Sequence, residues 1–490
     1  MALFSVPAKA VRLRDDARAA TIAAMADKPQ PHRDAASPPI VELADWLGDQ
    51  VAPADFPKTE LRWRNDRAAQ GVGLHELSDT QWLSHFGRFE PLPDNLPQPL
   101  ALRYHGHQFR VYNPDIGDGR GFLFAQVRDE AGRLLDLGTK GSGQTPYSRA
   151  GDGRLTLKGA VRELLATEML EALGVDTSQT FSIVETGENL WRGDEPSPTR
   201  SAVLTRLSHG HIRIGTFQRL LAYDEPEHMR ELVEYCLAQF PGPPPPQGAP
   251  ERDDPAVRLL HHVVERLADL AASWMVAGFV HGVLNTDNMN VSGESFDYGP
   301  WRWLPTWDPG FTAAYFDHNG LYAFGRQPEA LHWNCAQLAT ALRLIAPSDG
   351  LIAALERFGP LYGEQLRRRW LWRLGLKPRG EKADGALIAA CERHMRESGA
   401  QPDAFFFAHR GGRSASPELA AIFDAYEPTG PDHAYWHEGA PQSMLIDEVE
   451  AIWSAIDERD DWQPLCDKVE ALRHMGEAHG TAPPPAAQDR

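Results

Sequence analysis

The stretch HGVLNTDNMNVSGESFDYG, residues 281–299, decides how the fold of this chain is read, because it gathers acidic and amide side chains on a short irregular segment. It holds an Asp-Asn pair, Asp287 and Asn288, and then an Asp-Tyr-Gly triplet that begins at Asp297. The pattern predicts a loop, a short strand and a second turn. Two readings are open: a site for a metal ion and a nucleotide, or a plain polar hairpin, because Asn, Asp and Gly are common turn residues.

A long apolar helix is predicted directly before this stretch. The segment AVRLLHHVVERLADLAASWMVAGFVHG, residues 256–282, repeats apolar side chains at helical spacing along one broad face. A loop that leaves a buried helix has a rigid support, as loops that carry chemistry often do. His281, where helix and loop meet, is expected to hydrogen-bond the backbone and shape the loop rather than to catalyse. Residues 328–345 and several segments between 350 and 475 also have helical patterns.

Upstream, a predicted strand and a predicted helix carry a lysine and a glutamate. The strand LLDLGTK alternates so that its last residue, Lys140, projects away from the apolar face. The helix GDGRLTLKGAVRELLATEMLEALG has Asp152 as a candidate N-cap, Gly174 as its stop and Glu163 beside its apolar stripe. A strand Lys and a helix Glu form the ion pair of kinase phosphate sites, although any such pair could also be structural.

Two glycine-rich turns have little side-chain bulk, so their backbone amides can come close to a bound phosphate. The first, NPDIGDGRGFLFAQV, places Gly117, Gly119 and Arg120 before an apolar run, and glycine leaves room for a ligand. The second contains Asp152 and Gly153 directly before the predicted helix, whose free amides favour an anion. Taken alone, each turn could be a simple hairpin.

Two arginines complete the set that a nucleotide site needs. Arg206 and Arg213 lie in VLTRLSHGHIRIGTF, and arginine forks suit bidentate contacts with phosphate. Surface arginines paired with nearby acids are the alternative. Transfer from ATP also needs a divalent metal held by hard oxygen ligands and a carboxylate that takes a proton from the acceptor, which Asp287, Asn288 and Asp297 can supply. The occurrence of all these features in order favours a nucleotide-dependent transferase.

The composition argues against two classes of partner. With 49 Lys and Arg against 68 Asp and Glu, the formal net charge of −19 disfavours non-specific binding to nucleic acid or to an anionic membrane. No apolar run is long enough to span a bilayer. The four cysteines show no CxxC pattern, which indicates neither a zinc site nor a disulfide framework and favours a reducing compartment, the cytoplasm. The Ala/Arg-rich start imitates a mitochondrial transit peptide, but Asp15 and Asp16 interrupt it.

Composition and motif order also predict a division of the 490 residues. The segments are an irregular leader (1–40), an N-lobe-like nucleotide-binding region (41–205), a C-lobe-like catalytic region (206–345) with a Pro-rich surface loop (241–255), a helical C-terminal region (346–475) and a disordered tail (476–490).

The motifs YHGHQFRVYNPDIGDGRG, KGSGQTPYSRAGDGR, HIRIGTF, HGVLNTDNM, DYGPW and DHNGLYAFGRQP closely resemble the selenoprotein O family of protein adenylyltransferases, over residues 60–345. The resemblance implies an α+β fold of the protein-kinase-like, two-lobe type. Its N-lobe is mixed and holds a β-sheet, and its C-lobe is mainly helical with a C-terminal helical extension. It also implies that ATP binds flipped relative to protein kinases, so that AMP passes to a Ser, Thr or Tyr hydroxyl of a protein.

Carried onto matching positions, the resemblance makes Asp287 the proton acceptor and makes Asn288 and Asp297 ligands of Mg²⁺, with Mn²⁺ as the alternative ion. Lys140 would contact phosphate and be oriented by Glu163. The nucleotide site would also include Gly117, Gly119, Arg120, Asp152, Gly153, Arg206, Arg213 and Asp297. Two other functions stay open: a conventional protein or small-molecule kinase, and a nucleotide-binding pseudokinase scaffold. Metal ligands disfavour the scaffold, but residue types alone do not tell which phosphorus is attacked.

Two departures from the family pattern are visible. The sequence ends in PPPAAQDR instead of the family's Cys-Ser-Ser or selenocysteine ending, which puts redox control through that terminus in question. His105 and Arg110 stand where small residues are usual in the family, and they are expected to alter the edge of the pocket.

Overall fold

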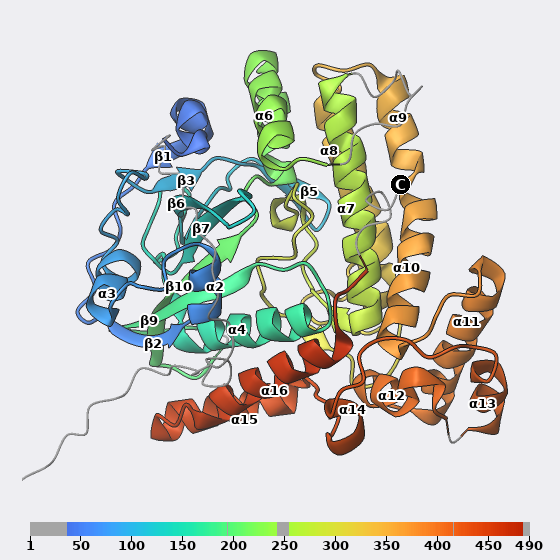
Figure 1. Cartoon of the computed structure of the whole chain (residues 1–490). Helices are drawn as coiled ribbons and strands as arrows, with labels where there is room; N and C mark the ends of the chain where they lie inside the picture. Colours follow the sequence, from blue (N-terminus) through green and yellow to red (C-terminus); the bar gives the residue numbers. More distant parts are fainter. Residues whose placement is uncertain (1–36, 194, 243–253, 415, 484–490) are drawn as a thin grey trace, which may run out of the picture. The chain divides into compact units, whose positions relative to one another are not determined.

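The computed structural model describes residues 37–193, 195–242, 254–414 and 416–483 (Figure 1). The chain forms two compact units. Of the described residues, the first contains those up to Leu102, Asp118–Ala160 and Thr180–Leu207, and the second contains Arg103–Gly117, Val161–Gln179 and those from Ser208 onward. The predicted α+β class is confirmed. Two segments from the first half of the chain, 103–117 and 161–179, group with the second unit, and the predicted division into lobe-like regions stays a prediction.

The first unit is built on an eight-stranded sheet, with the order β1-β3-β6-β7-β10-β9-β2 and with β8 beside β10. The pairs β1–β3, β3–β6, β6–β7, β2–β9 and β8–β10 are antiparallel. The strands are β1 (Gly48–Gln50), β2 (Glu60–Arg64), β3 (Leu100–Leu102), β6 (Leu123–Arg128), β7 (Leu134–Lys140), β8 (Leu155–Thr156), β9 (Gln179–Leu190) and β10 (Thr199–Ser208). Its short helices are η1 (Pro39–Leu43), α1 (Ala44–Leu47), α2 (Asp66–Gly71) and α3 (Asp79–Gly87).

An aromatic core holds α3 on this sheet. Trp82 on α3 stacks on Phe181 of β9 with 4.8 Å between ring centroids, and its indole Nε1 donates to Ser182 Oγ at 2.9 Å. The helix begins at a capping box, in which Ser78 and Gln81 satisfy each other's backbone amides. Burial of such large rings accounts for most of the stabilisation of a small sheet. Leu135 and Leu137 of β7, the strand that carries Lys140, belong to the same buried core.

The second unit is mainly helical. Its longer helices are α4 (Leu157–Ala172, from residue 161), α5 (Ile214–Ala222), α6 (Pro226–Gln239), α7 (Pro255–Ala277), α8 (Gln327–Leu342), α9 (Ser348–Glu356), α10 (Phe358–Leu374), α11 (Glu381–Ser398), α12 (Pro402–His409), α13 (Pro417–Phe423), α15 (Ile446–Arg459) and α16 (Gln463–His479). Its shorter elements are β4 (Gly106–Gln108), β5 (Val111–Asn113), β11 (Phe279–Val280), η3 (Thr286–Asn288), β12 (Arg302–Trp303), η4 (Phe324–Arg326), η5 (Arg410–Gly412) and α14 (Tyr435–Glu438).

Helix α7 is the central support of the second unit and packs against both α8 and α10, and Figure 1 shows α10 alongside it. Asp254 caps it by accepting from the amides of Ala256 and Val257 at 2.8 and 3.2 Å, and Gly278 ends it in the left-handed conformation with φ of +68°. The helix predicted from the sequence is confirmed, although it ends at Ala277 because strand β11 follows. Among the described residues, no helix combines the length and the apolarity needed to cross a membrane.

The helix predicted to begin at Asp152 begins later. Residues 155 and 156 form strand β8, which pairs with β10, so α4 starts at Leu157. Thr156 Oγ1 accepts from the amide of Gly159 at 3.1 Å. The prediction of Asp152 as N-cap is wrong because sheet pairing takes up the residues that follow it.

The short strand predicted between Asp287 and Asp297 is also absent from this described segment. In its place are two isolated bridges, one from Asn290 to Arg213 and one from Ser295 to Thr177. Each bridge pairs the segment with a distant part of the chain, so no continuous ladder forms. Of the other predicted segments, the parts at 1–36, 243–253 and 484–490 lie outside the described residues, and the tail's first residues, 476–479, form the end of α16.

Candidate active site

The loop after β11 is shaped by a buried histidine. His281 Nε2 lies 3.0 Å from the carbonyl oxygen of Phe296, and its Nδ1 accepts from the amide of Val283 at 3.4 Å. Its own amide donates to Gln327 Oε1 on α8 at 3.0 Å. Both ring nitrogens are used by backbone groups, so the predicted structural role of His281 is confirmed. The histidine joins the two ends of the acidic stretch.

Asp287 is buried in this loop and is only partly hydrogen-bonded. The residue is 8% exposed. Its Oδ2 accepts a hydrogen bond from Gln108 Nε2 at 3.4 Å. Its Oδ1 has no hydrogen-bond partner among the described residues. Burial raises the pKa of Asp287 from 3.8 to about 6, against the hydrogen bond from Gln108 and the charge of Arg213. Such a carboxylate is suited to accepting a proton.

A hairpin of β4 and β5 packs over the loop and holds it. The amide of His107 donates to Thr286 Oγ1 at 2.7 Å, and the amide of Phe109 donates to Asn285 Oδ1 at 2.9 Å. Thr286 in turn donates to Gln218 Oε1 on α5 at 2.6 Å. Backbone and side-chain groups on both sides of Asp287 are therefore tied to two other elements, which fixes the direction of the carboxylate.

Gly106 on β4 has to be glycine because of Asp287. A Cβ atom at this position would lie 2.8 Å from Asp287 Oδ1, 3.1 Å from Asp287 Cβ and 3.0 Å from Ile116 Cδ1. Ordinary non-bonded contacts between such atoms are longer. The hairpin backbone thus approaches the carboxylate more closely than any side chain allows.

Asp297 begins the Asp-Tyr-Gly triplet in a conformation that is rare for residues other than glycine. Its φ is +61°, in the left-handed region, where Asp and Asn occur more often than most other residues. Its Oδ2 lies 3.4 Å from Nη2 of Arg213, a buried residue whose guanidinium carbon lies 4.5 Å from the ring centre of Tyr104. This long ion pair places a positive charge beside the carboxylate.

Asn288 lies between the two carboxylates in sequence and is half-buried. Its Nδ2 donates to the carbonyl of Val283 at 3.2 Å, so the amide oxygen is the end that this bond leaves for another ligand. Glu163 on α4 belongs to the same unit and is buried. Its charge contributes to raising the pKa of Tyr298, the residue after Asp297, although burial is the main cause. Glu163, Arg213, Asp287, Asn288 and Asp297 therefore all belong to one unit, together with Gly117.

The other predicted residues, Gly119, Arg120, Lys140, Asp152, Gly153 and Arg206, belong to the first unit. Lys140, at the end of β7, and Arg206, on β10, are both buried, and Arg120 is exposed. The pairing of Lys140 with Glu163 stays a prediction.

In the second glycine-rich turn, Asp152 and Gly153 both contact other parts of the chain. Asp152 accepts from Arg192 Nη1 at 2.8 Å, and this pairing lowers its pKa although burial acts to raise it. Gly153 has a φ of +70°, and a Cβ there would lie 2.3 Å from the backbone of Gly143. The glycine is therefore required by a close approach of the chain to itself, whatever ligand is bound nearby.

Sequence reasoning missed the groups that position Asp287: Gln108, Thr286, Asn285 and Gln218. Thr286 and Asn285 flank Asp287, but Gln108 precedes it by 179 positions. The motif YHGHQFRVY contains Gln108, and its dense polar residues were the only signal. No local pattern links it to the loop, because long-range pairing is decided by tertiary packing.

The fold and the site define a class before any comparison: a mixed α+β protein with a buried acidic loop whose carboxylate is suited to accepting a proton. A sequence model of the family described as "Protein adenylyltransferase SelO" matches residues 34–427. Similar relatives named "Protein nucleotidyltransferase YdiU" occur in Synechocystis sp. (42% identical, covering 89% of this chain and 97% of the relative), Gloeobacter violaceus (42%, 89% and 94%) and Pseudomonas putida (40%, 67% and 65%). The chain therefore belongs to the SelO family, as its motifs predicted, and it is an enzyme of the nucleotidyltransferase class.

Proposed function

We propose that this enzyme transfers AMP from ATP to Ser, Thr or Tyr hydroxyls of proteins, with Asp287 as the proton acceptor. The observation that carries the proposal is the buried carboxylate of Asp287, which has a raised pKa and one oxygen without a partner among the described residues. A hydroxyl is a weak nucleophile, and a positioned base takes its proton as the bond to phosphorus forms. The family match supports nucleotidyl transfer as the reaction class.

Asp297 and Asn288 are the proposed ligands of Mg²⁺, or of Mn²⁺. Carboxylate and amide oxygens are the donors that such hard cations prefer, and Mg²⁺ takes few protein groups and keeps waters or phosphate oxygens. Asp297 fits this role because its carboxylate supplies such oxygens within the same unit as Asn288 and Asp287. When bound, the metal would neutralise charge on the phosphates of ATP. The residues of this chain hold and orient the reacting groups.

The remaining roles follow the family pattern. Lys140, oriented by Glu163, would contact phosphate, and the nucleotide would be lined by Gly117, Gly119, Arg120, Asp152, Gly153, Arg206 and Arg213. A two-lobe, kinase-like arrangement with the nucleotide flipped is part of the same proposal, as is the division into an N-lobe-like region (41–205), a C-lobe-like region (206–345) and a C-terminal helical region. Lys140 and Arg206 are both buried, so neither is an ordinary surface charge, which supports a role inside the protein.

The test is transfer of label from ATP that carries the isotope at either the α or the γ phosphorus. The protein itself and a cell lysate serve as acceptors, with Mg²⁺ or Mn²⁺ present. Protein-bound α-label is expected. Protein-bound γ-label alone would make the enzyme a kinase, and the absence of both labels with measurable ATP binding would favour a nucleotide-binding scaffold.

Gly106→Ala provides a test of the position of Asp287 without changing a charged group. The added Cβ would meet Asp287 Oδ1 at 2.8 Å, so the carboxylate has to move. We expect a loss of transfer of about 100-fold, the cost of a displacement of roughly 1 Å at a reacting group. The rate is measured as α-label incorporated per unit time.

Gly385→Ala is the matched control for this variant. Gly385 lies within α11, and a Cβ there has no atom within 4 Å. Its transfer rate is expected to stay unchanged, and its stability should increase by about 1 kcal/mol because alanine favours a helix over glycine. If Gly106→Ala is as active as Gly385→Ala, Asp287 is not the positioned base.

A further inference from the structure

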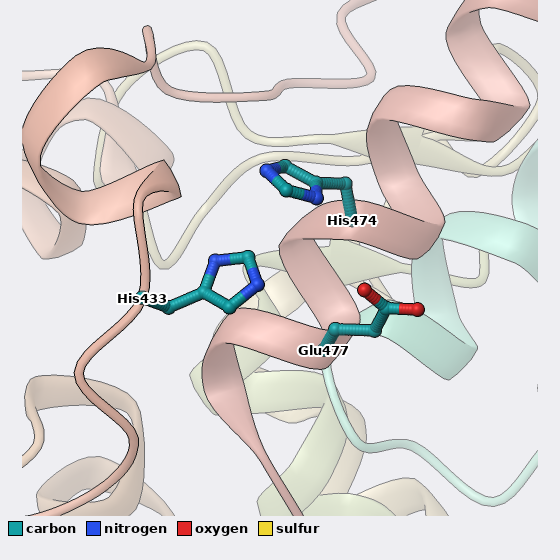
Figure 2. A group of neighbouring side chains, drawn as sticks. All are labelled: His433, His474 and Glu477. Atoms are coloured by element: carbon teal, nitrogen blue, oxygen red, sulfur yellow. The ribbon is translucent and has the colours of Figure 1, made fainter. Parts of the chain in front are cut away.

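A cluster of nitrogen and oxygen donors lies in the C-terminal part of the second unit, far along the chain from the acidic loop. His433, His474 and Glu477 have potential ligand atoms that all lie within 4.8 Å of one another. Figure 2 shows the two rings and the carboxylate turned toward a common space. The ring centroids of His433 and His474 are 4.6 Å apart. Three side chains that can each bind a metal thus converge.

The cluster joins two elements. His474 and Glu477 are three positions apart on α16, so they lie on the same face of that helix. His433 comes from the segment just before α14. A bound ion would therefore fix α16 to this segment, although the two are not neighbours in sequence. This is the arrangement in which a metal stabilises a fold.

The surroundings leave the donors available. Among the described residues, no hydrogen bond or ion pair engages the side chains of His474 and Glu477, and both residues are exposed. The cation next to them in sequence, Arg473, is turned to Glu168 on α4, with nitrogen–oxygen distances of 2.7 and 2.9 Å. Because this arginine pairs elsewhere, no positive side chain from the adjacent position of α16 competes with an ion at the cluster.

We propose that His433, His474 and Glu477 form a site for a transition-metal ion of the Zn²⁺ class. Two imidazoles and one carboxylate are a donor set that Zn²⁺ uses in proteins, whereas Mg²⁺ prefers oxygen alone. Tetrahedral Zn²⁺ with bonds of about 2.0 to 2.1 Å places its donor atoms roughly 3.3 Å apart. Side-chain rotation closes the remaining distance, since two of the three residues are exposed. Its residues and its ion differ from those at Asp297, so metal binding here is tested separately from the proposed reaction.

His433 determines how strongly the ion is held. Its Nδ1 accepts a long hydrogen bond from the amide of Tyr435, at 3.3 Å, so Nε2 is the donor for the metal. Binding at Nε2 places the ring proton on Nδ1, and this hydrogen bond is lost. The metal affinity is therefore expected to be lower than at sites where a second group accepts the proton of the ligating histidine.

The site bears on the proposed catalytic region through helix packing. Gly476 on α16 packs on Ala172 of α4, since a Cβ at Gly476 would lie 3.2 Å from Ala172 Cα. The same helix α4 carries Glu163. A metal that fixes α16 would thus stabilise the helix that backs Glu163.

The experiment is a Zn²⁺ titration of metal-stripped full-length protein in the presence of excess Mg²⁺, read by competition with a chromogenic chelator. We compare the wild type with His433→Gln, His474→Gln and, as matched control, His75→Gln, which changes an exposed histidine of the first unit. The wild type and the control are expected to bind about one equivalent more than either cluster variant, whose affinity should fall by at least about 10-fold. Equal binding by all four proteins would overturn the proposal.

A thermal readout separates a built site from casual surface binding. Zn²⁺ should raise the Tm of the wild type and of His75→Gln but not of the two cluster variants, because only a ligand of the folded state stabilises it. Excess Mg²⁺ should leave this difference unchanged. If Zn²⁺ instead binds at half an equivalent and doubles the sedimenting mass, the cluster links two molecules, and the intramolecular site is refuted.

Discussion

Asp297→Asn is expected to abolish adenylyl transfer while the protein stays folded. Asparagine tolerates the left-handed φ of +61° at this position, so the backbone need not change. The substitution removes the negative charge that faces Arg213 and that would bind the metal. We expect a loss of at least about 1000-fold in kcat/KM, which corresponds to about 4 kcal/mol of transition-state stabilisation.

Asp460→Asn is the matched control, because Asp460 also has a positive φ, of +51°, and is exposed at the end of α15. It should retain wild-type transfer. Both variants are compared by α-label incorporation and by Tm. Transfer by Asp297→Asn at the rate of Asp460→Asn would show that Asp297 does not hold the metal.

Asp287→Asn is expected to lower kcat by about 100- to 10 000-fold, the range for loss of a general base. ATP binding should persist, since the proposed contacts with phosphate come from other residues. The measurement is kcat and KM for ATP together with the Kd of ATP in the presence of Mg²⁺. A large rise in KM without a fall in kcat would assign Asp287 to nucleotide binding instead.

The same substitution has a predictable effect on stability in metal-free buffer with EDTA. Burial raises the pKa of Asp287 to about 6 in the folded protein, above its ordinary value of 3.8. The folded protein therefore binds this proton more tightly than the unfolded protein does. The destabilisation that the buried charge causes is absent below about pH 4, grows between the two pKa values and is complete above about pH 6. The stability that Asp287→Asn gains over the wild type should therefore be larger at pH 8 than at pH 5. An equal difference in Tm at both pH values would contradict the buried charge.

Local elements were predictable where short-range chemistry decides them. The helix over residues 256–282 was predicted from its apolar spacing, and the structure has it as α7, with Asp254 as its cap and Gly278 at its end. The structural role of His281 was also predicted, because a histidine at a helix–loop junction has backbone groups within reach. The helix start at Leu157 was not predictable, and Asp152 was wrongly predicted as the cap, since pairing of β8 with β10 depends on a strand far away in sequence.

The sequence by itself determined which chemical groups this protein has, the order in which they occur and the family to which it belongs. Only the tertiary structure decided the burial, the pKa and the spatial neighbours of those groups. The hairpin of β4 and β5 buries Asp287 and forces glycine at position 106, and its contacts with the loop span 176 to 179 positions. The cluster of His433 with His474 and Glu477 likewise exists only because α16 packs beside the segment before α14. Burial, pKa and metal geometry depend on neighbours in space, and residue patterns record neighbours in sequence.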